Sequence, residues 1–326
     1  MARPRRIELP HCMYHILSRT NSGDSAFRDQ ADEHKFLEYL VKFSGLFGVR
    51  VHAWCLMSTH FHLLVETGPD SALSEMMRRL LTAYTVYYNR RTLRHGHLFQ
   101  GRFKSLVVDK ADYLLKVSRY IHLNPFHAKI TDDPFKYFGS SLGYYVNGNG
   151  PKWLDTRETL AWFECDRKKY ARFIREGLGR EIALDVYQQR YIGGEKFAAR
   201  IRKRLDLREQ PGSRAAAAQD VRAEQLRQRQ EHEAKRLLKA VAEYYDVNPN
   251  TLRRLLYLRG PEGKARKVLA ALLRDRLTWS CREIGEYLGL KRNVERYLGI
   301  FGGDEELRMD YKNIKLSLSR EADPQR

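Results

Sequence analysis

The sequence predicts an α+β protein, with a ferredoxin-like antiparallel sheet and packed helices followed by an all-α C-terminal helix-turn-helix domain. Strand-like and helix-like patterns alternate over residues 1–148 in the order β-α-β-β-α-β-α, which is typical of helices packed on an antiparallel sheet. Beyond this segment the sequence indicates amphipathic helices. The length of 326 residues is enough for about two domains with their own cores.

Each element predicted in the N-terminal part is inferred from its own hydrophobic pattern. The helix predicted from residue 29 places Phe36, Leu40 and Phe43 on one stripe. The run that follows it is rich in β-formers, so we expect two consecutive strands, or a hairpin that turns near Ser58. The last helix should end before Pro125, because the residue before a proline is disfavoured in the α region. The expected strands are 11–19, 49–59, 60–67 and 105–109, and the expected helices are 29–47, 71–92 and 110–124.

Two histidines stand one residue apart in the second of these consecutive strands. Alternate side chains of a strand share a face, so His60 and His62 lie together on one face and Phe61 lies on the other. Paired imidazoles are a good start for a divalent metal site. The alternative is a hydrogen-bonded histidine pair at the edge of a core, and the pattern alone leaves both interpretations open.

A tyrosine and an asparagine share a face of the helix predicted over residues 110–124. Tyr120 and Asn124 are four residues apart, hence one turn apart on the same side. A tyrosine can attack a phosphodiester if a metal neutralises the charge of the phosphate, and two imidazoles with an Asn oxygen suit Mg²⁺ or Mn²⁺. The chain has 19 tyrosines, however, and periodicity does not choose among them. Tyr113 lies on nearly the same stripe, and Tyr84, Tyr87 and Tyr88 crowd another helix.

Between these two motifs the segment GHLFQGRFKS alternates basic and aromatic residues. Positive charge follows a phosphate backbone and aromatic faces stack bases, the combination that binds single strands. The phenylalanines could equally belong to the core. The residues that we expect to contact DNA here are His97, Phe99, Gln100, Arg102, Phe103 and Lys104.

Composition narrows the class of protein. The net charge of +19 and the sequence pI of about 9.8 favour a polyanionic partner. No apolar run approaches the ~20 residues of a membrane span, and no secretory signal is apparent at the N-terminus. The four cysteines are scattered and predict neither a zinc site nor disulfides. We therefore expect a cytoplasmic nucleic-acid-binding protein without membrane contact, acting as a monomer or homodimer.

The C-terminal half divides into three expected segments. We predict a helical extension over 149–204, a charged linker over 205–234 and a helix-turn-helix domain over 235–318. A capping box of Ser280 with Glu283 opens one short helix, and Gly289 lies at the turn to the next. An ordinary helical bundle is the alternative. The phosphate-binding residues expected at the second helix are Lys291, Arg292 and Arg296.

Taken together, HFHLLVE, GHLFQGRFKS and RYIHLNPFHA resemble the REP-associated tyrosine transposases, single-tyrosine members of the His-hydrophobic-His (HUH) nucleases, from about Tyr14 to Tyr145. The resemblance implies that His60, His62 and Asn124 bind the metal, and that Tyr120 attacks the scissile phosphate. A 5′-phosphotyrosine link would form and a 3′-OH would be released. Thr59 and Phe126-His127 depart from the family pattern, where Asn and Val-Arg are commoner.

The C-terminal segment resembles, more faintly, the DNA-binding domain of the replication initiator DnaA. Lys291-Arg292-Asn293-Val294 replaces the signature of that domain's recognition helix, so base-specific readout is not implied. We therefore expect a metal-dependent endonuclease and strand transferase acting on single-stranded or hairpin DNA, in transposition or the mobilisation of repeat elements. The alternative is a non-catalytic, sequence-specific DNA-binding regulator on the same fold. For the enzyme, activity should fall below about pH 6 as the imidazoles are protonated.

Overall fold

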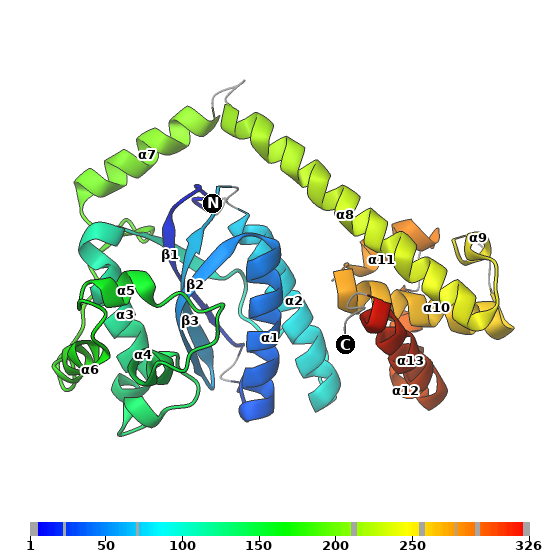
Figure 1. The fold of residues 1–326 in the computed structure, drawn as a ribbon, viewed down its shortest axis with the longest axis horizontal. Coiled ribbons are helices and arrows are strands. Elements are labelled where there is room, and N and C mark those ends of the chain that lie inside the picture. The colour runs from blue at the N-terminus through cyan, green and yellow to red at the C-terminus, as the bar shows by residue number, and fades with distance from the viewer. Residues whose placement is uncertain are drawn as a thin grey trace. The chain divides into compact units, whose positions relative to one another are not determined.

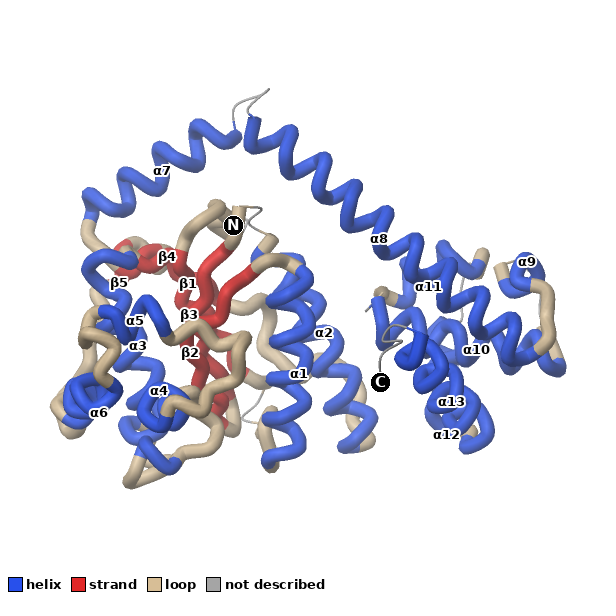
Figure 2. Tube along the Cα trace, viewed as in Figure 1, coloured by secondary structure: helices blue, strands red, loops and turns tan. Residues whose placement is uncertain are grey.

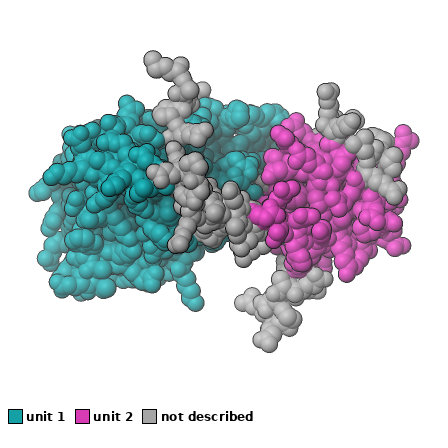
Figure 3. Space-filling view, turned by 90° about the horizontal axis from the view of Figure 1, so that it is seen from above, with its two compact units in different colours: residues 1–219 teal, residues 220–326 magenta. Residues whose placement is uncertain are grey.

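The computed structural model describes residues 6–21, 24–69, 72–209, 214–253, 258–277, 279–290 and 294–321. The chain forms two compact units, residues 1–219 and residues 220–326, which are coloured separately in Figure 3. No helix in the described part of the chain is both long and apolar enough to cross a membrane.

The first unit is built on a sheet whose described strands follow the order β2-β3-β1-β4-β6-β5. Strand β1 (Met13–Arg19) pairs antiparallel with β3 (His60–Thr67) on one side and with β4 (Lys104–Val108) on the other. Strand β2 (Val49–Met57) forms an antiparallel hairpin with β3. The order β2-β3-β1-β4 is the ferredoxin-like arrangement, so the predicted fold class is confirmed.

Helices cover both faces of this sheet, as Figures 1 and 2 show. On one face lie α1 (Gln30–Leu46) and α2 (Leu73–Thr92), whose rings reach the sheet: Phe36 packs on Phe61 with a centroid distance of 4.9 Å. The opposite face carries α3 (Lys110–His127), which buries Val117 and Ile121 against Leu64 and its neighbours. The helix that holds Tyr120 therefore packs on the face of the sheet that carries His60 and His62.

Two local predictions were wrong. Helix α3 continues through Pro125 to His127, because the proline falls in the last turn, where its ring is buried and the bond from Ala128 N to Asn124 O still forms. The predicted helical extension also contains the two-residue strands β5 (Val186–Tyr187) and β6 (Tyr191–Ile192). Strand β6 pairs parallel with β4, and strands this short leave no periodicity in the sequence.

Short helices and then two long ones follow the core. The predicted linker 205–234 is largely helical, since it falls within α7 and α8; the alanine- and glutamine-rich composition there favours a helix. The bounds are η1 Pro134–Lys136, α4 Leu142–Asn147, α5 Arg157–Ala161, α6 Arg167–Arg175, α7 Glu195–Glu209 and α8 Arg214–Tyr245.

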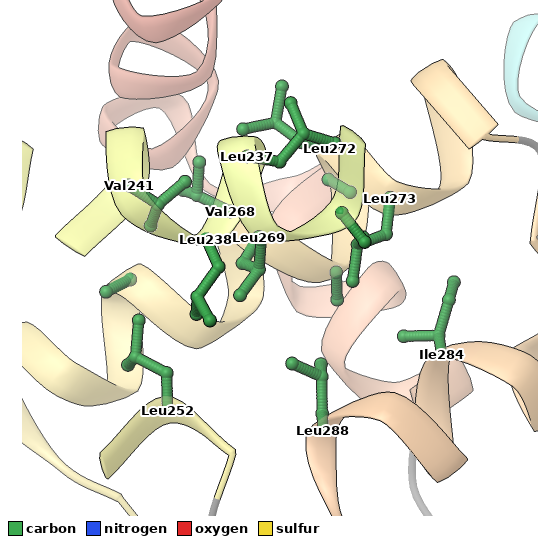
Figure 4. Packing of buried hydrophobic residues seen from close by; sticks show 14 of the residues in the cluster. Leu237, Leu238, Val241, Leu252, Val268, Leu269, Leu272, Leu273, Ile284 and Leu288 are labelled. Carbon is green, nitrogen blue, oxygen red and sulfur yellow. The ribbon is translucent and has the colours of Figure 1, made fainter. Parts of the chain in front are cut away.

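The second unit is a helical bundle. Leu237, Leu238 and Val241 of α8 pack on Val268 and Leu269 of α10, as Figure 4 shows. The capping box of Ser280 and Glu283 is present at the start of α11, and Gly289 ends that helix with a φ of 66°. The bounds are α9 Pro249–Leu252, α10 Gly260–Leu272, η2 Leu273–Leu277, α11 Cys281–Leu288, α12 Val294–Gly303 and α13 Glu305–Glu321.

Candidate active site

The register between β1 and β3 places three histidines on the face that α3 covers. Arg19 lies opposite His60 and Leu17 lies opposite His62. His15 precedes Leu17 by two residues and therefore points to the same face. The predicted pair is thus extended by a third imidazole, contributed by a strand distant in sequence.

The three imidazoles and the Tyr120 ring form one cluster. His15 Nε2 lies 2.9 Å from His62 Nδ1, and the two rings are stacked with centroids 5.1 Å apart. The His60 ring meets the His62 ring edge-on at 5.2 Å. From α3, the Tyr120 ring meets both His15 and His62 edge-on, each at 5.7 Å. The structure therefore brings Tyr120 and the predicted histidine pair together.

Burial keeps these imidazoles uncharged. It lowers the pKa of His15 to about 4. Burial is the main reason why the pKa of His62 lies well below its usual range. The charges of His15, His60 and Arg19 lower it further. Burial and the charge of Arg19 lower the pKa of His60. All three rings are neutral at pH 7, so each keeps a lone pair with which to accept a proton or bind a metal.

The other tyrosines that the sequence left open hold their hydroxyls elsewhere. Tyr84 donates to Ala26 O at 2.5 Å, and Tyr88 donates to Ser25 O. Tyr113 donates to Asp185 Oδ2 at 3.0 Å, and its pKa is raised by burial and by that carboxylate. Tyr87 lies 3.5 Å from Ala31 O. Of these candidates, Tyr120 is the one whose ring meets the histidine cluster.

Asn124 follows Tyr120 by one turn of α3 and is half-buried. Its side-chain amide makes no hydrogen bond within the described part of the chain, and its backbone carbonyl accepts from Ala128 N. The amide oxygen is therefore available as a ligand. No contact places it against the histidines.

The N-terminal part of the chain is similar to known proteins. Residues 8–124 match the family model described as "Transposase IS200 like". The matched segment contains His15, His60, His62 and Tyr120, and it ends at Asn124.

Among solved structures, the chain is similar to one described as "Structure of the REP associates tyrosine transposase bound to a REP hairpin". The identity is 16%, the TM-score is 0.40, and the match covers 46% of this chain and 89% of that chain. No curated protein matches the chain.

In the first unit, the phenylalanines of GHLFQGRFKS belong to the core. Phe99 is 7% exposed and packs on Phe61 and Tyr84, and Phe103 is 6% exposed beneath the Arg6 guanidinium, 3.8 Å from its ring centroid. Rings buried to this extent fit the interpretation that they are core residues. They do not fit the prediction that they stack on bases. The polar residues of the segment, His97, Gln100, Arg102 and Lys104, are exposed.

The remaining DNA-binding predictions lie outside what the structure describes. Lys291 and Arg292 are not among the described residues, and for Arg296, in α12, only the backbone is described. The helices α11 and α12 flank this stretch. Phosphate binding by these three residues stays a prediction.

A different cluster in the first unit has metal-ligand chemistry. Within the described residues, the group of His, Cys, Asp or Glu whose ligand atoms lie within 4.8 Å of one another is His52, Glu66 and Glu158. Cations already occupy this cluster: Lys110 Nζ lies 3.1 Å from Glu66 and 2.5 Å from Glu158, and Arg50 lies 2.7 Å from Glu66. Although burial raises it, these cations and His52 lower the pKa of Glu66 to about 2. The arrangement is an ion-pair network.

We call the face of the sheet that carries His15, His60 and His62 the histidine face. The sequence analysis missed two of its residues. His15 and Arg19 both lie in β1, whose sequence MYHILSR places the apolar Leu17 between them on the same face, so β1 lacks the adjacent polar alternation of the His60–His62 pair. Only the β1–β3 register shows that they share a face with the pair. Lys104, which was predicted, also points to this face, because it lies opposite Leu17.

Proposed function

We propose that the protein is a metal-dependent, single-tyrosine DNA endonuclease and strand transferase acting on single-stranded or hairpin DNA. Tyr120 is the nucleophile, and His60, His62 and Asn124 hold a divalent metal, Mg²⁺ or Mn²⁺. The observation that carries this proposal is the edge-on packing of the Tyr120 ring against His62 and His15. The match of residues 8–124 to the transposase family model supports it.

The side chains present fit a divalent metal. His60 and His62 are neutral, so protons do not compete for their lone pairs at pH 7. No third His, Cys, Asp or Glu among the described residues completes a cluster with them, which leaves the free amide oxygen of Asn124 as a protein donor. A metal bound there would neutralise the phosphate charge and polarise its oxygens.

The reaction of the side chains is an in-line exchange at phosphorus. The Tyr120 oxygen forms a bond to the scissile phosphorus as the bond to the 3′ oxygen breaks. The phenolic proton passes to solvent, and a proton from solvent completes the leaving 3′-OH. The product is a 5′-phosphotyrosine link. Attack of a 3′-OH on this link reverses the exchange, so one tyrosine serves both cleavage and joining.

Positive charge around the cluster suits a DNA strand. Arg19 and Lys104 are exposed on the histidine face, and His97, Gln100 and Arg102 lie exposed nearby in sequence. These side chains would hold phosphates without reading bases. In the second unit, α11 and α12 with Gly289 between them are the proposed helix-turn-helix for duplex binding.

The test is the covalent adduct itself. The protein is incubated with a labelled hairpin oligonucleotide and Mn²⁺, and the products are separated in SDS. We expect an SDS-resistant adduct that Tyr120→Phe and EDTA abolish. Tyr113→Phe, on the same helix, is the matched control and should form the adduct at the parent rate.

An undiminished adduct in Tyr120→Phe would overturn the assignment of the nucleophile. Tight hairpin binding without any adduct from the parent would favour the non-cutting regulator instead.

A further inference from the structure

His15 is the part of the cluster that the proposed roles leave unused. Its side chain is 2% exposed, its Nε2 faces His62 Nδ1 at 2.9 Å, and its Nδ1 has no hydrogen-bond partner within the described residues. Its ring also lies against Tyr120. A buried imidazole with one nitrogen unpaired is a costly core residue, since an unsatisfied buried polar atom costs about 1–3 kcal/mol.

The hydrogen bond between the two rings allows two arrangements of one proton. In a pair of neutral imidazoles each ring carries one N–H, so one ring donates across the 2.9 Å contact and the other accepts. If His15 donates from Nε2, His62 accepts at Nδ1 and carries its own proton on Nε2, so neither nitrogen is free. If His62 donates from Nδ1, its Nε2 keeps a lone pair, and the proton of His15 moves to the unpaired Nδ1.

We propose that His15 is a positioning residue that accepts the Nδ1–H of His62, so that His62 Nε2 is free to bind the metal. This inference rests on the proposed metal site. Histidine ligands commonly donate their second N–H to a carboxylate, a backbone carbonyl or water, which fixes the tautomer and the ring orientation. Here the acceptor is a neutral imidazole, and the stacked geometry, with rings 18° from parallel, holds both rings in place.

The choice of acceptor has an electrostatic consequence. A carboxylate would add a negative charge behind the ligand and oppose the approach of a phosphodiester. An imidazole orients His62 without adding charge. Glu66 is the carboxylate of the same strand face, and its ion pairs with Arg50 and Lys110 engage it elsewhere. The positive charge that a bound metal would supply at the scissile phosphate would therefore be retained.

His15 also links the ligand to the nucleophile. Its ring contacts Tyr120 edge-on at the same 5.7 Å centroid distance as His62 does. A change at this position can therefore act in two ways, through lost support of the phenol ring or through the lost proton acceptor. The variants below separate the two.

The test measures Mn²⁺ binding to the full chain by titration calorimetry, without DNA. His15→Phe keeps an aromatic ring against Tyr120 but has no acceptor, and we expect it to bind Mn²⁺ at least about ten-fold more weakly. His15→Gln restores an acceptor oxygen, and we expect it to recover most of the affinity. His34→Phe, at an exposed position of α1, is the matched control and should bind as the parent does.

Nitrogen NMR of the parent labelled in its histidine rings provides a readout that does not depend on a folded variant. In the Mg²⁺-loaded protein we expect His62 to carry its proton on Nδ1. Parent-like Mn²⁺ affinity in His15→Phe, or a His62 proton on Nε2 in the loaded protein, would overturn the inference.

His62→Ala distinguishes this failure from failure of the proposed function. If the parent binds no Mn²⁺, or if His62→Ala binds as tightly as the parent, the proposed metal site is refuted. The proposed role of His15 is then refuted as well. If His62→Ala loses binding while His15→Phe does not, only the role of His15 is refuted.

Discussion

A buried histidine next to the proposed nucleophile gives a quantitative prediction for stability. His122 lies fully buried on α3, two residues after Tyr120. Its Nδ1 lies 2.8 Å from the Tyr170 hydroxyl and its Nε2 lies 2.8 Å from Ser141 Oγ, which ties α3 to α6 and to the segment before α4. Burial lowers the pKa of His122 to about 3.

The sign and size of the pH effect follow from this pKa. In the unfolded chain a histidine titrates near 6.5. Below that pH His122 binds a proton in the unfolded state but stays neutral in the folded state. The free energy of unfolding therefore falls as the pH is lowered from about 6.5 toward 3. Between pH 7 and pH 5 the loss attributable to His122 is about 2 kcal/mol. This is a large share of a typical free energy of unfolding of about 5–15 kcal/mol.

The perturbation is His122→Gln, which removes the titrating group and part of both hydrogen bonds. At pH 7 we expect it to lower the free energy of unfolding by about 2–4 kcal/mol, because two buried hydrogen bonds weaken and packing is lost. At pH 5 this deficit should shrink by about 2 kcal/mol, because the variant no longer takes up that proton on unfolding.

The assay is urea unfolding at both pH values, followed by tryptophan fluorescence. A Trp279→Phe background removes the tryptophan of the second unit, so the signal comes from Trp54, Trp153 and Trp162 in the first. His34→Gln, at an exposed position, is the control and should show no such pH effect. An equal deficit at pH 7 and pH 5 would refute the reasoning.

Three further predictions concern other parts of the chain. Arg19→Gln should slow adduct formation about ten-fold and reduce the salt dependence of DNA binding, because a cation opposite His60 is lost; unchanged kinetics would contradict this. Ser280→Ala should destabilise the second unit by about 1 kcal/mol through loss of the capping box, read from Trp279 fluorescence during unfolding. Gly139→Ala should cost about 1–3 kcal/mol in urea unfolding, since a Cβ there would lie 2.6 Å from Leu56 O; a neutral effect would show that the segment can shift.

The order of elements could be predicted because each one carries a local pattern. Phe36, Leu40 and Phe43 recur at helical spacing, and all three are buried in α1. The parts that failed depend on contacts outside their own segment. The β5–β6 pairing is two residues long and is held by β4, and the buried position of Pro125 lets α3 run on for one more turn.

For the candidate site, the sequence could supply residue types but not their neighbours. The shared face of His60 and His62 follows from strand alternation, and that of Tyr120 and Asn124 follows from helical spacing, but spacing did not single out Tyr120 among the tyrosines. His15 belongs to the same cluster only because β1 pairs with β3 in one register, which is a long-range property. Phe99 was ambiguous for the same reason: whether a ring faces solvent or Phe61 depends on packing.

On the histidine face, buried imidazoles lower the stability of the fold but are held in one chemical cluster. A core selected only for packing would place leucine or phenylalanine at positions as buried as His15 and His62, because burial of an imidazole with an unpaired nitrogen is unfavourable. The opposite face of the same sheet shows that alternative, with Phe61 packed against Phe36. The burial that is costly for folding is also what keeps the imidazoles neutral, and neutral imidazoles can bind a metal or accept a proton near pH 7. Local violations of good core design of this kind concentrate at functional sites. That asymmetry between the two faces of one sheet is a physical reason, independent of the family match, to propose the site where Tyr120 meets β1 and β3.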